Sequence, residues 1–126
     1  MTGARGESII QSRDGEGREY RILFTNRALA EAESTIGKSI IAIAQGFQVG
    51  ATGFSEISKL LAAGLEAARR EARTGGRTLT IMDAYKVMDE VGFTECSRAV
   101  MEAIGAVLRY GNEDTERPAS DAAPNP

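Results

Sequence analysis

The pattern of hydrophobic and polar residues predicts a β-hairpin at the start of the chain. Polar and apolar residues alternate over 19–24, as in a strand with one covered face, and a shorter strand is expected over 8–12. The Asp-Gly pair at 14–15 is typical of a hairpin turn between them. A lone hairpin is marginally stable in water, so its apolar face should pack on helices, first of all on the third one. The residues of that face are Tyr20, Ile22 and Phe24.

After the hairpin, apolar residues recur at helical spacing in four to five segments. Capping residues support their ends: Thr25 or Asn26 before the first, Gly37 after it, and Thr80 with Asp83 at the start of the fourth. Because strands come first and helices follow without alternation, the pattern predicts a helix-rich α+β fold. The predicted helices span about 26–36, 40–47, 55–74, 80–91 and 94–110.

Composition divides the 126 residues into three parts. Residues 1–6 are small and glycine-rich and are expected to be flexible, and residues 7–110 form a single domain. Residues 111–126 hold four acidic residues against one arginine, three prolines and no large apolar residue, which predicts a disordered acidic tail. The N-terminus lacks the apolar stretch of a secretory signal and no segment is long enough to cross a bilayer, so we expect a cytoplasmic protein.

The residue types narrow the chemistry. The chain has no histidine and one cysteine, Cys96, which excludes histidine-dependent catalytic triads, an internal disulfide and a cysteine-cluster zinc site. Cys96 falls on an apolar helical stripe and is expected in the core. The net charge of −3 comes from the tail, since the rest of the chain is neutral, so binding of nucleic acid is not favoured. We therefore expect neither an enzyme nor a cofactor or metal protein.

Two surfaces are candidates for binding a partner. Apolar residues surround more than one face of the short second helix, which either leaves a binding patch beside the glycine-rich loop at 46–53 or is buried on all sides. An arginine cluster ends the third helix, where it either complements the helix dipole or binds an acidic partner or RNA. The candidate residues are Ile40, Ile41, Ile43, Phe47, Arg69, Arg70, Arg73 and Arg77.

Two smaller groups leave alternatives open. Asp89 and Glu90 lie late in a helix, where carboxylates oppose the helix dipole, and form either a solvated pair or a docking contact for a basic partner. Three methionines at 82, 88 and 101 are interpreted as core residues rather than as a binding groove.

An ordered set of motifs resembles a family of small tail proteins encoded by tailed phages, prophages and gene transfer agents, beside the tail tube gene. Phe24-Thr25-Asn26-Arg27-Ala28-Leu29-Ala30-Glu31-Ala32-Glu33, followed by Ile36-Gly37-Lys38-Ser39-Ile40, resembles the family's central stretch. Its hairpin is similar to Gly6-Glu7-Ser8-Ile9-Ile10 with Tyr20-Arg21-Ile22-Leu23-Phe24-Thr25, and its later segments to Ala63-Gly64-Leu65, Leu79-Thr80 and Met88-Asp89-Glu90-Val91-Gly92. The resemblance covers residues 6–108, and differs at the 46–53 linker and in the arginine-rich 67–77 segment.

The resemblance implies a tail assembly chaperone. Such a protein would hold the long tape measure protein in the bacterial cytoplasm until tail tube subunits polymerise around it, and would need no catalytic group. Its partners would be the tape measure and tail tube proteins, with a homo-oligomer as a further possibility and no membrane. The alternatives are a minor structural subunit of the mature tail and, third, a small nucleic-acid-binding domain. A mostly helical chain cannot supply the β-rich sheet of a tube subunit.

Overall fold

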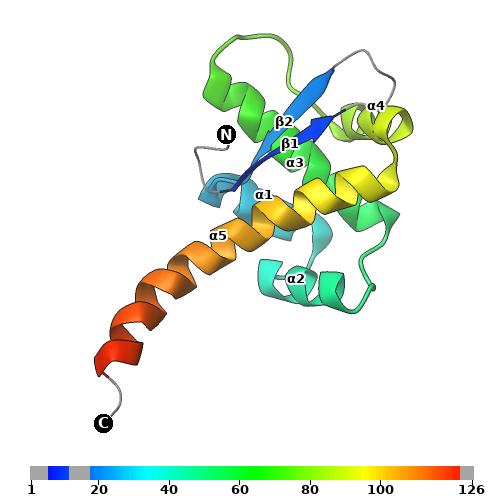
Figure 1. The fold of residues 1–126 in the computed structure, drawn as a ribbon. Coiled ribbons are helices and arrows are strands. Elements are labelled where there is room, and N and C mark those ends of the chain that lie inside the picture. The colour runs from blue at the N-terminus through cyan, green and yellow to red at the C-terminus, as the bar shows by residue number, and fades with distance from the viewer. Residues whose placement is uncertain (1–5, 12–17, 123–126) are drawn as a thin grey trace.

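The computed structural model describes residues 6–11 and 18–122. Within them an antiparallel two-stranded hairpin precedes five helices, which confirms the helix-rich α+β fold (Figure 1). The expected Asp-Gly turn at 14–15 lies outside the described residues, as do 1–5 and 123–126. The elements are β1 (Glu7–Gln11), β2 (Glu19–Leu23), α1 (Asn26–Ile36), α2 (Ile40–Gln48), α3 (Phe54–Ala72), α4 (Ile81–Val91) and α5 (Phe93–Ala122).

The hairpin packs against α3, as the alternating pattern predicts. Ile22 is fully buried and Phe24, just after β2, is 2% exposed. Both lie on Gly64 of α3, where an added Cβ would stand 3.0 Å from the Ile22 Cβ and 3.1 Å from the Phe24 Cζ. The missing side chain at Gly64 therefore lets strand and helix approach closely, and this contact belongs to the hydrophobic core.

The predicted capping residues lie at the ends of α1 and at the start of α4. The Thr25 hydroxyl accepts a hydrogen bond from the Ala28 N–H, and Gly37 has the left-handed φ of 86° expected after α1. Thr80 and Asp83 form a capping box at α4. The helix α3 begins earlier than the predicted residue 55: Gly53 is its N-cap, because the Gly53 carbonyl accepts the Ile57 N–H at 3.0 Å. Phe54 thus enters the first turn of α3.

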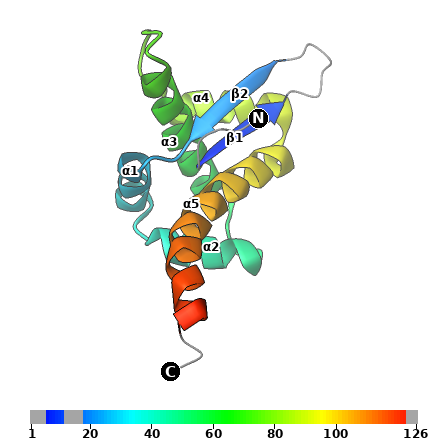
Figure 2. The same cartoon turned by 60° about the vertical axis from the view of Figure 1, so that its left-hand side comes forward.

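The structure describes backbone at both ends of the predicted domain. Gly6 belongs to the fold, since its carbonyl accepts the Phe24 N–H at 2.8 Å and a Cβ there would lie 2.7 Å from the Phe24 carbonyl oxygen. The α5 backbone stays helical to Ala122, through most of the segment expected to be disordered. Extending an existing helix adds one hydrogen bond for each residue ordered and needs no new nucleus. The end of α5 extends away from the rest of the molecule (Figures 1 and 2).

The helix α5 also closes the core. Its buried stripe faces the hairpin and α3, and Cys96 lies in it with no exposed surface, as predicted. In the part of the chain that the structure describes, no helix has both the length and the apolar character needed to cross a membrane. The buried residues of the stripe are Cys96, Ala99, Val100, Ala103 and Ile104.

Candidate functional site

The patch expected on α2 is divided by the fold. Ile40 and Ile43 are 5% and 2% exposed and belong to the core, so the surface of α2 does not include them. Phe47 packs beside them and is half-buried. Helical spacing places these three residues on the inner face, whereas Ile41 points outward and is 61% exposed. One large apolar side chain of the expected patch, Ile41, is therefore open to a partner.

The arginine cluster at the end of α3 is held by acids of the same chain. Glu66, only 7% exposed, accepts hydrogen bonds from the Arg69 Nε and Nη2 at 2.8 and 2.7 Å, from the Arg70 Nε at 2.9 Å and from the Leu79 N–H at 2.8 Å. These bonds lower the pKa of Glu66 to about 2, and the hydrogen bonding from Arg69 makes the largest contribution. The network fastens the segment after α3 to the helix.

The other two arginines have different settings. Arg77 forms a two-pronged pair with Asp83, at 2.9 and 2.6 Å, and this contact holds the pKa of the Asp83 carboxyl far below its usual range. Arg73 takes the left-handed conformation, with φ 58°, at the C-cap of α3, and forms no ion pair within the described residues. Three of the four candidate arginines thus serve internal contacts.

An apolar groove lies on another part of the surface, where α3, α4 and α5 meet. It encloses about 600 Å³. Phe54 is its most exposed aromatic residue, at 67%, and Tyr85 is 45% exposed. Exposed apolar surface of this kind, in a concave site, is typical of a surface that binds another protein. The lining residues are Phe54, Ser55 and Ser58 from α3, Tyr85, Met88 and Asp89 from α4, and Phe93 from α5.

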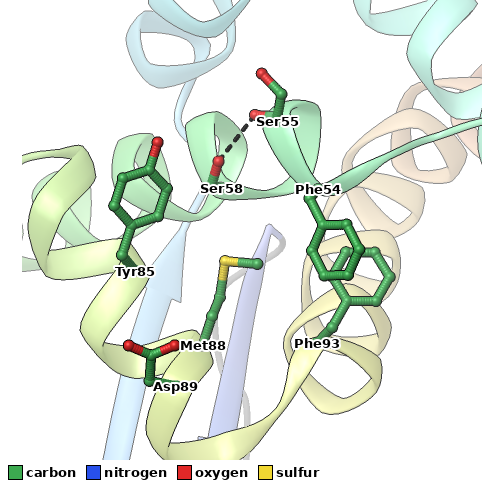
Figure 3. A pocket seen from close by; sticks show the side chains of 7 residues that line it. All are labelled: Phe54, Ser55, Ser58, Tyr85, Met88, Asp89 and Phe93. Atoms are coloured by element: carbon green, nitrogen blue, oxygen red, sulfur yellow. Dashed lines mark hydrogen bonds between the residues drawn. The ribbon is translucent and has the colours of Figure 1, made fainter.

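Two aromatic rings form one wall of the groove. The rings of Phe54 and Phe93 are in contact, tilted by 46° to each other with centroids 4.3 Å apart (Figure 3). Met88 reaches into the groove from α4, between these rings and Tyr85. The aromatic contact keeps Phe54 in place on the surface although little else covers it.

The groove continues on both sides through shared residues. Phe93 also lines a hollow of about 530 Å³ along α5, together with Ser97 and Met101. Tyr85 also lines a hollow of about 500 Å³ between α1, α3 and the start of α4. A track of three hollows therefore crosses α1, α3, α4 and α5 and is longer than a single side-chain pocket.

The two neighbouring carboxylates on α4, Asp89 and Glu90, have different surroundings. Glu90 accepts a hydrogen bond from the Tyr20 hydroxyl at 2.5 Å and lies 3.6 Å from an Arg18 guanidinium nitrogen, so it ties α4 to the hairpin. Asp89 is exposed and lines the groove, and it makes no hydrogen bond or ion pair with any described residue. Only Asp89 remains available for a basic partner.

The methionines do not behave as one group. Met88 is half-buried in the groove, but Met82 and Met101 are 61% and 38% exposed, so the prediction of core positions is wrong for these two. Met82 points outward because the inward positions of α4 are occupied by Ala84, Val87 and Val91. On α5, next to Met101, the inward positions are occupied by Val100, Ala103 and Ile104.

Sequence reasoning missed the two residues that dominate the groove, Phe54 and Phe93. A signal was present: each is an aromatic residue directly after a glycine, at the first position of a helix. The Cα–Cβ bonds of a helix tilt toward its N-terminus, so the side chain at the first position extends past the first turn.

No group of three or more histidine, cysteine, aspartate or glutamate side chains in the described residues is arranged to hold a metal ion. Burial, and then the nearby Glu95, raises the pKa of the Cys96 thiol to about 11, which keeps it in the unreactive protonated form at neutral pH.

Comparisons of the chain with protein-family models, with curated proteins and with solved structures find no match.

Proposed function

We propose that this chain is a tail assembly protein of a phage or gene transfer agent, a chaperone that binds the tape measure protein until tail tube subunits polymerise. The observation that carries the proposal is the apolar groove between α3, α4 and α5. A long helical partner with exposed apolar patches aggregates unless another protein covers them, and a groove of this kind offers that cover without catalysis. The site of action would be the cytoplasm of the bacterial host.

The motif residues that carry the resemblance have clear structural roles. Thr25 and Ser39 cap α1 and α2, and Gly37 provides the left-handed residue between these helices. The Glu33 carboxylate accepts the Ile40 N–H at 2.8 Å, closing the same corner. The resemblance therefore concerns residues that build the fold, and the partner surface is proposed from the groove and not from these motifs.

The two alternative functions, a minor tail subunit and a nucleic-acid-binding domain, differ in their support. A minor subunit of the mature tail would also need an apolar contact surface, so it remains the second candidate. The nucleic-acid proposal loses support, because Arg69, Arg70 and Arg77 are already paired with acids of the chain. Phosphate contacts would have to break these pairs first.

Co-expression with the tape measure protein of the same genome tests the proposal. The wild-type chain should keep the tape measure protein soluble and co-purify with it. Phe54→Ser and Tyr85→Ser change exposed groove residues and should reduce the soluble fraction severalfold. Val49→Ser removes an exposed apolar side chain outside the groove, at a position that is not a candidate for partner binding, and serves as the control.

Two results would decide against the chaperone. If the wild-type chain leaves the tape measure protein insoluble and does not bind it, the proposed function is wrong. If mass spectrometry finds many copies in purified mature tails, the chain is a structural subunit.

A further inference from the structure

We infer that the groove binds an amphipathic helix that carries large apolar side chains on one face and a lysine or arginine beside them, which pairs with Asp89. This inference rests on the proposed function in that it describes how the partner is recognised. It concerns the groove residues Phe54, Tyr85, Met88, Phe93 and Met101 together with Asp89.

The apolar side of the partner follows from the shape of the track. The hollow between α3 and α4 and the hollow along α5 share Phe93, so their occupant needs apolar side chains at more than one point along its length. Met88 and Met101, one in each hollow, are unbranched and adapt their shape to different apolar partners. Residues three, four and seven apart on one helix face supply such a row.

A helical partner fits the groove better than an extended peptide does, because the two differ in how their backbone hydrogen bonds are satisfied. The groove is built from side chains of three helices, and the strands β1 and β2 do not line it. An extended peptide laid there would leave its N–H and C=O groups without partners, whereas a helix satisfies them internally.

The basic residue follows from charge complementarity. Three charged residues line the two hollows, namely Asp89, Arg98 and Glu102. Arg98 is bound by Glu102 at 3.0 Å and by Glu95 at 2.7 Å, so its charge is already balanced. Asp89 has no such partner among the described residues, which leaves one negative charge in the groove for a cation to meet.

The chain itself is a poor occupant. Its segment 111–126 has four acidic residues and no large apolar one, so it would bring like charge and nothing to bury. A second copy placed groove to groove would put two Asp89 carboxylates into one interface, where the one lining cation, Arg98, is already paired. A separate basic amphipathic helix has neither defect.

The test uses two synthetic 18-residue helices with the same leucine face, one with lysines and one with glutamates flanking it. The chain, labelled with ¹³C on its methionine methyl groups, is titrated with each peptide by NMR. Met88 and Met101 report on the groove, and Met82, exposed on α4 but outside both hollows, is the internal control. We expect the lysine peptide to shift Met88 and Met101, leave Met82 unchanged, and bind about two- to fivefold more tightly than the glutamate peptide.

Variants separate the charge contact from general attraction. Asp89→Asn should remove most of the preference for the lysine peptide. Glu71→Gln makes the same change in net charge at an exposed site outside the groove and should retain the preference. Equal binding of both peptides, an unchanged preference in Asp89→Asn, shifts centred on Met82, or no shift with either peptide would each overturn the inference. These results do not depend on the tape measure protein, so failure here and failure of the proposed function are distinguishable.

Discussion

The two ends of α3 present opposite kinds of surface. At the C-terminal end, Glu66 is buried and accepts four hydrogen bonds from Arg69, Arg70 and Leu79. At the N-terminal end, Phe54 is two-thirds exposed and touches one other ring, that of Phe93. The arginine cluster at the C-terminal end was a candidate binding surface in the sequence, yet most of its charges are paired within the chain. The apolar side chain at the N-terminal end stays exposed, so it is the end that a partner can contact.

The largest effect is expected in the middle of α3, between these ends. Ile22→Asp places a carboxylate with no counter-charge against Gly64, and burying it costs more than a domain of this size can lose. The variant should show no cooperative thermal transition by circular dichroism. Ile41→Asp, at an exposed position, should melt like the wild type. A cooperative Ile22→Asp transition near the wild-type Tm would contradict the buried hairpin face.

At the charged end, Glu66→Gln should lower the free energy of unfolding by about 2 kcal/mol and Tm by about 8 °C. The neutral amide cannot accept from two guanidinium groups as the carboxylate does, while both arginines stay in place. Binding of the tape measure protein should be unaffected. Glu31→Gln, an exposed acid that pairs with Arg27 and Arg70, is the control and should change stability by less than about 0.5 kcal/mol.

Acid should abolish the same contribution. The pKa of Glu66 is lowered to about 2 in the fold from an ordinary 4.5, so its stabilising effect is complete above pH 4.5 and is lost as the pH falls toward 2. Urea unfolding at several pH values should therefore show wild type and Glu66→Gln converging at low pH. A difference that persists undiminished at pH 2 would mean that the carboxylate charge is not the cause.

At the apolar end, Phe54→Ser should cost at most about 1 kcal/mol, the value of one aromatic pair. The same variant is expected to lose most of its ability to keep the tape measure protein soluble. Glu66→Gln at the C-terminal end of α3 would thus lower stability and leave binding unchanged. Phe54→Ser at the N-terminal end would reduce binding and lower stability only slightly. A large drop in Tm for Phe54→Ser would show that the residue is structural and would remove the contrast.

The smallest effect on stability is expected outside α3, from truncation of the chain after residue 110. The removed residues include no large apolar one, so Tm should stay within about 2 °C of the wild type. The helical signal should fall, because the α5 backbone is helical to Ala122. A Tm lower by several degrees would show that this segment supports the body.

Local patterns in the sequence were sufficient for the fold class and for most element boundaries. Alternation identified the hairpin, and the capping role of Thr25, the left-handed Gly37 and the capping box from Thr80 to Asp83 were all readable from residue type and spacing. These features depend on groups a few residues apart, whose geometry the backbone dictates. The helical backbone of 111–122 was not readable, since it depends on the helix that precedes it.

The tertiary structure alone decided which surfaces remain open. Sequence spacing showed that Ile40, Ile41, Ile43 and Phe47 surround a short helix, but packing assigned Ile40 and Ile43 to the core and left Ile41 outside. Likewise Glu66 and Leu79, thirteen positions apart, meet only because the segment after α3 folds back. Phe54 and Phe93 come together only through the packing of α3 against α5. Exposure and charge balance depend on neighbours distant in the chain, and for that reason the candidate site emerged from the structure and not from the sequence.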